Sequence, residues 1–224
     1  PSIYNLTPTG VAGTFISKLD RSGSFVWAKK IDASRGTYSS SLAIDAIGDI
    51  YTCGVFYDTG DFDPGPASYI MAANNGAGIF ISKLNAAGNF IWAKSMAGSQ
   101  DVFSRCMVVD GPGNVYLSGE FYGIADFDPG ASVFTMSSVG RYYTAFFSKL
   151  DPSGNFVWAK SFRANSANAI TLDATGNIYL RGEFGNVDSI DFDPGPGVAS
   201  LTSNGQFDIF ISKFNPAGDF ISAC

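Results

Sequence analysis

Hydrophobic and polar residues alternate in short segments along the whole chain, and turn residues separate these segments. In one stretch the alternation predicts four strands, over 41–45, 49–56, 78–84 and 89–96, with a long insertion at about 57–77. Asp/Asn-x-x-Gly turns join the strands, and their glycine suits the left-handed position of a tight hairpin loop. No segment keeps the helical period of about 3.6 residues. The pattern therefore predicts an all-β chain.

The chain is built from repeats. A five-residue motif, Phe-Ile/Phe-Ser-Lys-Leu/Phe, occurs four times. The segment Gly-x-Phe-Val/Ile-Trp-Ala-Lys follows its first three copies, and Gly-Asp-Phe-Ile-Ser-Ala-Cys follows the fourth. A second motif, Asp-x-x-Gly-Asp/Asn-Ile/Val-Tyr, ends at Tyr51, Tyr116 and Tyr179, and Asp-Phe-Asp-Pro-Gly begins at 61, 126 and 191. The four copies of the first motif, at offsets of 65, 66 and 64 residues, are Phe15-Ile-Ser-Lys-Leu, Phe80-Ile-Ser-Lys-Leu, Phe146-Phe-Ser-Lys-Leu and Phe210-Ile-Ser-Lys-Phe.

Each repeat is expected to form a four-stranded antiparallel sheet that stacks face to face with the next, as blades do in a β-propeller. We expect one repeat region over 1–224, with about three and a half repeats. It comprises a partial blade over 1–35, blades over 36–100 and 101–165, and a blade over 166–224 that stops at its last strand. An open β-solenoid stack is the alternative. Because a propeller ring typically needs four to eight blades, the sequence predicts a fragment of a longer propeller, or a ring or fibre completed by other copies.

These motifs resemble those of a family of bacterial secreted β-propeller repeats, the SBBP-type repeats. The family unit looks like F-V-A-K-L-D-x-x-G-x-x-x-W followed by G-I-A-V-D-x-x-G-N-V-Y-V-T-G, and residues 80–92 and 107–119 are similar to it. The chain departs from the family in its Asp-Phe-Asp-Pro-Gly insertion, which makes it a variant. The resemblance implies an extracellular or cell-surface location in a bacterium, and it implies no assigned activity.

The amino-acid composition argues against several classes of function. The chain has no histidine, the commonest general base, and its three cysteines lack the spacing of a zinc site or a disulfide framework. With Lys+Arg 14 and Asp+Glu 20, the formal net charge of −6 argues against a nucleic-acid-binding surface. No apolar run reaches the ~18–20 residues of a membrane helix. We therefore expect no catalytic residues, no nucleic-acid partner and no membrane insertion.

The aspartates of the insertion are the candidate metal ligands. Carboxylates at alternate positions of an extended segment point to one side and repel each other unless a cation or hydrogen-bond donors lie between them. Calcium, which takes oxygen ligands from irregular loops, is the one cofactor that this pattern predicts. The alternative is that these aspartates are Asx-turn residues that stabilise the Pro-Gly turn. The predicted ligands are Asp58, Asp61, Asp63, Asp126, Asp128, Asp188, Asp191 and Asp193.

Residues that recur at the repeat period indicate structural roles, and residues that do not recur indicate function. We expect the repeated tryptophans to pack between blades and the repeated lysines to pair with nearby aspartates. Non-repeating residues gather in 74–77, 99–101 and 140–143, which we expect to be loops or loop edges. A binding surface is expected there first.

The sequence thus predicts a non-enzymatic, secreted structural or interaction module, with Asp loops stiffened by calcium. Its expected partners are other copies of itself, or the rest of a longer chain, with a glycan or a protein as a further ligand. The alternative is a carbohydrate-binding or carbohydrate-cleaving propeller. That alternative would use Glu120, Glu183 and the loop tyrosines Tyr122, Tyr142 and Tyr143.

Overall fold

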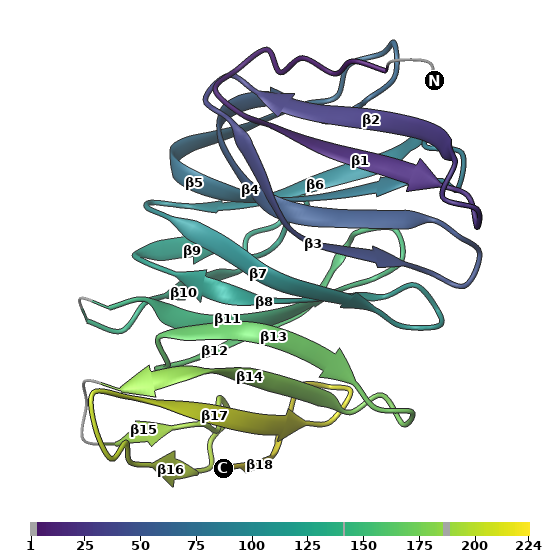
Figure 1. Cartoon of the computed structure of the whole chain (residues 1–224). Helices are drawn as coiled ribbons and strands as arrows, with labels where there is room; N and C mark the ends of the chain where they lie inside the picture. The colour runs from purple at the N-terminus through teal and green to yellow at the C-terminus, as the bar shows by residue number, and fades with distance from the viewer. Residues whose placement is uncertain (1–3, 141, 186–188) are drawn as a thin grey trace.

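The computed structural model of the chain describes residues 4–140, 142–185 and 189–224. These residues form eighteen β-strands and no helix, so the all-β prediction is confirmed. Accordingly, none of these residues lies in a helix long and apolar enough to cross a membrane. Figure 1 shows the sheets stacked in chain order, with the two termini at opposite ends of the stack.

The strands form propeller-like blades that pair antiparallel in chain order. Blade 1 has two strands, β1 (Gly13–Leu19) and β2 (Phe25–Ala33). The other three blades have four strands each. Blade 2 contains β3 (Thr37–Ile44), β4 (Ile50–Asp61), β5 (Ile70–Leu84) and β6 (Phe90–Gly98). Blade 3 contains β7 (Val102–Val109), β8 (Val115–Phe121), β11 (Thr144–Leu150) and β12 (Phe156–Phe162). Blade 4 contains β13 (Ser166–Leu172), β14 (Ile178–Gly185), β17 (Phe207–Phe214) and β18 (Phe220–Ala223).

The insertion of each repeat forms a hairpin, and in blades 2 and 3 this hairpin pairs with the preceding blade. In blade 2 it continues β4 and β5, and the end of β4 pairs with the end of β2, Asp32 opposite Asp61. In blade 3 it consists of β9 (Ile124–Asp126) and β10 (Thr135–Ser137), and β9 pairs with β6. In blade 4 it consists of β15 (Ile190–Asp191) and β16 (Ser200–Leu201). In blade 2, β4 and β5 therefore run beyond the strands predicted over 49–56 and 78–84, because they stay paired with each other into the insertion, and the end of β4 also pairs with β2.

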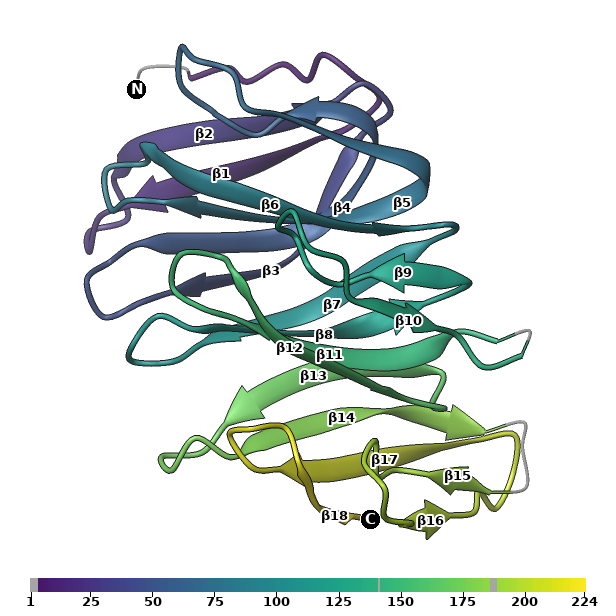
Figure 2. The same cartoon turned by 180° about the vertical axis from the view of Figure 1, so that it is seen from behind.

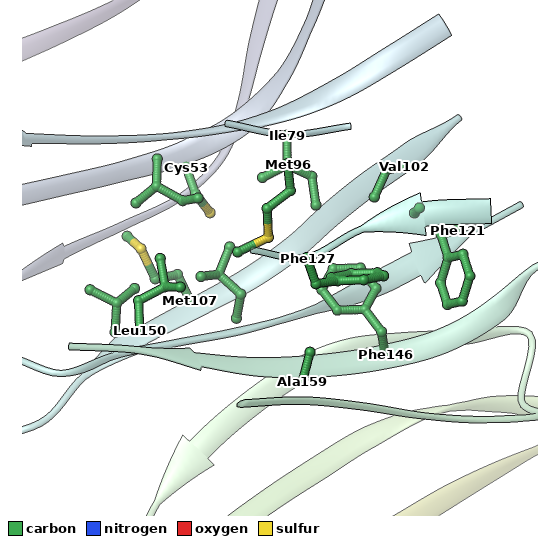
Figure 3. Close-up of a cluster of buried hydrophobic side chains, with 14 of the residues drawn as sticks. Cys53, Ile79, Met96, Val102, Met107, Phe121, Phe127, Phe146, Leu150 and Ala159 are labelled. Atoms are coloured by element: carbon green, nitrogen blue, oxygen red, sulfur yellow. The ribbon is translucent and has the colours of Figure 1, made fainter. Parts of the chain in front are cut away.

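A hydrophobic core fills each of the three junctions between neighbouring blades. Figure 3 shows the junction of blades 2 and 3, where Ile79 and Met96 of blade 2 face Phe121 and Phe146 of blade 3. Blades 2 to 4 thus each bury one apolar face against the blade before them, and blades 1 to 3 each bury one against the blade after them. Neighbouring blades are therefore stabilised by shared cores rather than by a core inside any one sheet.

The phenylalanine of the Asp-Phe-Asp motif is part of these cores. Phe127 is fully buried, with ring centroids 5.2 Å from Phe121 and 4.7 Å from Phe146. The equivalent residues of blades 2 and 4, Phe62 and Phe192, are also fully buried between two rings of their own blade. The insertion is therefore anchored by one aromatic side chain per repeat.

The turn between the third and fourth strands of a blade packs on the tryptophan of the blade before it. Gly154 has a φ of 77°, and a Cβ atom there would lie 3.3 Å from the Trp92 ring and 3.0 Å from the Lys94 side chain. Trp92 also donates a hydrogen bond to the carbonyl of Pro152 at 3.3 Å. The same approach recurs for Gly88 on Trp27 and for Gly218 on Trp158. The predicted packing of the tryptophans between blades is confirmed.

Replacing Gly154 by alanine is expected to destabilise the protein more than replacing Gly23. Gly23 occupies the same turn of blade 1 with a φ of 81°, but a Cβ atom there meets nothing within 4 Å. Both substitutions carry the cost of a left-handed alanine, about 1–2 kcal/mol. Gly154→Ala also displaces Trp92 and Lys94, which adds about 1–3 kcal/mol. Urea unfolding of the two variants checks this, and equal losses would show that the turn does not bear on the preceding blade.

Candidate functional site

The blades present two different edges to solvent. Because the strands of a blade alternate in direction, the turns after the first and third strands lie at one edge, and the other connections lie at the opposite edge. The first edge, the turn edge, lies on the right in Figure 1 and carries seven glycine turns of one type. The second, the variable edge, carries the blade-to-blade connections 34–36, 99–101 and 163–165 and lies on the right in Figure 2. Repeated sequence therefore builds the turn edge, whereas the variable edge combines the repeated Asp-Phe-Asp-Pro-Gly insertions with the non-repeating connections between blades.

The aspartates of the insertion accept hydrogen bonds from the backbone of their own hairpin. Oδ1 of Asp61 accepts from the N–H groups of Asp63 at 3.1 Å and Tyr69 at 2.9 Å. Oδ1 of Asp63 accepts from the N–H of Gly65 at 2.7 Å. These are the Asx-turn contacts that formed the alternative to calcium. Equivalent bonds are made by Asp126, Asp128, Asp191 and Asp193.

The predicted calcium ligands do not come together as one cluster in the described part of the chain. Among those residues, no three His, Cys, Asp or Glu side chains are placed so that they could hold a metal ion. Asp58 lies where the pairing of β4 and β5 shifts register, with a φ of 66°, and accepts a hydrogen bond from the Ser34 hydroxyl at 3.0 Å. Asp188 lies outside the described residues. Calcium binding stays a prediction.

Aspartates of the turn edge serve as caps for its hairpins. Oδ1 of Asp173 accepts hydrogen bonds from the Thr175 hydroxyl at 2.7 Å and from the N–H of Asn177 at 3.0 Å, and Oδ2 accepts from the Asn177 side chain at 2.9 Å. The Thr175 hydroxyl first, and the Asn177 side chain second, hold the pKa of this carboxyl below its ordinary value of 3.8. Lys213 lies 3.8 Å from the same carboxylate, as expected for a repeated lysine. These contacts rigidify the turn edge rather than leaving groups free for a ligand.

Stability is expected to depend on the ionisation of Asp173 at low pH. Since its folded pKa is lowered, its contribution is fully present above the unfolded pKa of about 3.9 and is lost as the pH falls through the folded value. Asp173→Asn removes this contribution. The difference in free energy of unfolding between wild type and variant should therefore shrink as the pH is lowered from about 7 to about 3. Urea titrations across that range measure it, and a constant difference would contradict the assignment.

Aromatic side chains gather at the variable edge of blades 2 and 3. The ring centroid of Tyr143 lies 5.9 Å from that of Phe103 and 5.8 Å from that of Tyr122. In blade 2, the rings of Tyr38 and Tyr57 are 6.3 Å apart. Burial first, and then the charge of Asp101, raises the pKa of both Tyr57 and Tyr143, so the two groups lie around the same carboxylate. We call these five aromatic residues the tyrosine ledge.

An ion pair lies beside the ledge. Arg105 donates to Oε1 of Glu120 from Nε at 2.8 Å and also from Nη2, and its guanidinium lies over the Phe103 ring at 5.6 Å from the centroid. Glu120 is only 4% exposed, and burial raises its pKa despite the hydrogen bond from Arg105. Glu183, the other glutamate, has the equivalent place on β14 of blade 4 and is exposed. The two glutamates thus occupy different environments on neighbouring blades, and Glu120 is held in a pair rather than presented to solvent.

Two of the three non-repeating segments contribute directly to this site. Asp101, from 99–101, accepts the N–H of Ala77 at 2.9 Å, which joins it to the segment 74–77, now seen to lie within β5. Tyr143, from 140–143, is the centre of the ledge. Sequence reasoning missed Phe103 and Arg105. Arg105 lies at the bulge of the first strand, where the other blades have Ser40 and Asn168. Comparing the equivalent positions of the repeats would therefore have singled out Arg105.

Comparisons with known proteins relate the chain to a repeat protein but to no family model. No protein-family model matches the chain, so the resemblance to secreted bacterial repeats rests on the quoted motifs alone. An uncharacterized WD repeat-containing protein of Acanthamoeba polyphaga mimivirus is 26% identical over 136 residues, which is 54% of this chain and 9% of that protein. The chain is also similar to a protein of unknown function from Bacteroides caccae, with 12% identity, a TM-score of 0.28, and coverage of 90% of this chain and 86% of that one. The chain therefore spans less than a tenth of the length of the WD-repeat relative.

Proposed function

We propose that the chain is a non-catalytic, repeat-built module that binds a protein partner through the tyrosine ledge at its variable edge. The distribution of tyrosine and lysine carries this proposal. Five of the ten tyrosines lie at the variable edge, whereas all eight lysines lie within strands of the repeat. Tyrosine and arginine are enriched, and lysine is depleted, in the centres of protein interfaces. The surface thus has the composition of a binding site for protein.

The architecture supports the same conclusion. Stacked repeats hold a row of loops at fixed spacing, so that neighbouring blades present one continuous surface to a partner. The mimivirus protein to which the chain is similar is a WD repeat-containing protein, and this similarity favours an interaction module built from repeats. The extracellular location, the calcium ions and the self-association remain proposals from the sequence.

Selection from a displayed library of random peptides tests the proposed function. Peptides selected on the wild-type protein are compared on two double variants that each remove two partly exposed tyrosines. Tyr38→Ala/Tyr143→Ala disrupts the ledge, where the residues are 48% and 38% exposed. Tyr4→Ala/Tyr69→Ala is the matched control elsewhere on the surface, where they are 57% and 40% exposed.

We expect selected peptides to lose binding to the ledge variant and to retain binding to the control variant. Circular dichroism and thermal unfolding of both variants establish that the blades are intact. Peptides that bind the ledge variant as well as the wild type, or a selection that enriches none, would overturn the assignment of the ledge as the binding surface.

A further inference from the structure

A groove of about 330 Å³ lies where blade 1 meets blade 2, close to the turn edge. One wall is formed by β1 over residues 16–19, together with Trp27 of β2. The facing wall contains Leu42 and Ile44 of β3, and its lining is mainly apolar. No residue of the tyrosine ledge lines it. We call this surface the β1 groove.

In the β1 groove, β1 has an unpaired edge. This strand corresponds to the third strand of a complete blade, and among the described residues it pairs only with β2. The third strands of the other blades, β5, β11 and β17, also pair on their second edge, with β4, β8 and β14. An edge strand presents backbone N–H and C=O groups that can pair with an added strand. The groove therefore lies where a second strand lies in every other blade.

The facing strand, β3, lacks the cover that equivalent strands have. Leu42 and Ile44 project from the same face of β3 and are 52% and 61% exposed. Met107 and Ile170 occupy the place of Leu42 in blades 3 and 4, and both are buried. They are covered by the first two strands of the preceding blade. A strand in the β1 groove would cover Leu42 and Ile44 in the same way.

Lys18 of β1 lacks the tyrosine that each equivalent lysine contacts. Lys18 instead donates a hydrogen bond to the carbonyl of Ala86 at 2.7 Å. The equivalent lysines lie over second-strand tyrosines, with 4.7, 4.9 and 5.0 Å between Nζ and the ring centroid. These pairs are Lys83 on Tyr51, Lys149 on Tyr116 and Lys213 on Tyr179.

Trp27 also lacks a partner in the groove. Ala86 occupies the place of Pro152, whose carbonyl accepts a hydrogen bond from the Trp92 indole at 3.3 Å. In the groove, Lys18 donates to the Ala86 carbonyl, and Nε1 of Trp27 is buried with no hydrogen-bond partner among the described residues. A buried donor without an acceptor is unfavourable. A ligand that draws Lys18 away would leave the Ala86 carbonyl to Trp27.

We propose that the β1 groove binds an unpaired β-strand of a partner polypeptide with the signature Asp-x-x-Gly-Asn/Asp-Ile/Val-Tyr-x-x-Gly, which β4, β8 and β14 share. In those blades the tyrosine lies opposite the repeated lysine, and the glycine lies opposite the repeated phenylalanine. The added strand accordingly runs antiparallel to β1, with its tyrosine opposite Lys18 and its glycine opposite Phe15. This inference goes beyond the proposed function, because it concerns a second surface.

A second folded copy of the chain does not supply this strand. In the part of the chain that the structure describes, each strand with the signature is already paired on both edges. These pairings are β4 with β3 and β5, β8 with β7 and β11, and β14 with β13 and β17. The partner must therefore offer the strand from outside a complete blade.

Titration with a peptide that has the sequence of residues 173–184 tests the inference. This peptide, Asp-Ala-Thr-Gly-Asn-Ile-Tyr-Leu-Arg-Gly-Glu-Phe, carries the whole signature, and a scrambled peptide of the same composition is the comparison ligand. Heteronuclear NMR of the labelled protein reports affinity and position, and Trp27→Phe assigns the Trp27 indole signal. We expect the peptide to saturate, to shift that signal, and to slow hydrogen exchange of the β1 amides over residues 16–19.

Two double variants locate the binding surface. Leu42→Ser/Ile44→Ser removes the apolar wall of the groove and should weaken peptide binding about tenfold. Ile209→Ser/Ile211→Ser is the matched control on β17 of blade 4, where the side chains are 59% and 50% exposed, and it should leave binding unchanged. Circular dichroism checks that both variants fold, and the wild-type signals decide the outcome if one does not.

Several results would overturn the inference. These are failure of the peptide to bind, equal binding of the scrambled peptide, and binding that Leu42→Ser/Ile44→Ser leaves unchanged. A Trp27 indole signal that stays in place at saturation would do the same. Shifts confined to Tyr57 and Tyr143 would place the peptide on the tyrosine ledge instead of the β1 groove.

Discussion

Phe127→Ala is expected to lower the free energy of unfolding by about 3–5 kcal/mol. The side chain is fully buried between Phe121 and Phe146 in the core that joins blades 2 and 3. Its removal leaves a cavity that the two remaining rings cannot fill without disturbing β8 and β11, which carry them. Urea unfolding followed by tryptophan fluorescence measures the change.

Phe134→Ala is the matched control for this substitution. Phe134 lies in the same insertion and contacts Phe156 at 4.8 Å, but it is 38% exposed. We expect it to cost about 1 kcal/mol, since much of its area already faces water. Similar losses for the two variants would mean that the insertion is a loosely attached loop and that Phe127 does not anchor it.

Gly119→Ala is expected to cost about 3 kcal/mol or more. A Cβ atom at this position would overlap the carbonyl oxygen of Phe103 on the neighbouring strand and lie 2.9 Å from the Phe146 ring. The nearest obstacle is backbone, so β7 would have to separate from β8 at the bulge that carries Arg105. The same glycine recurs as Gly54 and Gly182 with the same neighbours.

Gly111→Ala controls for the loss of glycine itself. Gly111 lies in a turn of the same blade, and a Cβ atom there meets nothing within 4 Å. Its replacement should change the free energy of unfolding by no more than about 0.5 kcal/mol. The comparison is made by chemical denaturation. A mild effect of Gly119→Ala would indicate that β7 and β8 are not paired as closely as described.

The fold could be predicted from the sequence because each repeat carries its own strand and turn signals. Alternating residues around Tyr51 and Tyr116 mark strands, and the glycines at positions such as Gly48 and Gly113 mark turns with positive φ. The extension of β4 into the insertion could not be predicted in this way. It is formed by pairing with β5 across a register shift and, at its end, with β2 of the neighbouring blade, and a local pattern contains neither contact.

The proposed binding surface could be located in part from the sequence. Non-repeating segments located Asp101 and Tyr143, since function breaks the regularity that a scaffold requires. For the insertion aspartates, the sequence motif alone could not distinguish a metal site from a turn. Their spacing fits metal ligation and turn formation equally well in sequence, and only the hydrogen bonds of Asp61 and Asp63 show that their Oδ1 atoms make Asx turns.

We propose that repeated sequence builds a scaffold and that the variable edge of this scaffold binds a partner. Hydrogen–deuterium exchange with and without a peptide from the displayed library tests this most directly. Protection should appear in the connections 34–36 and 99–101 and in the ledge strands around Tyr57 and Tyr143, and the seven glycine turns should be unchanged. Protection confined to the turn edge would contradict the account, because it would place the binding surface on the repeated scaffold.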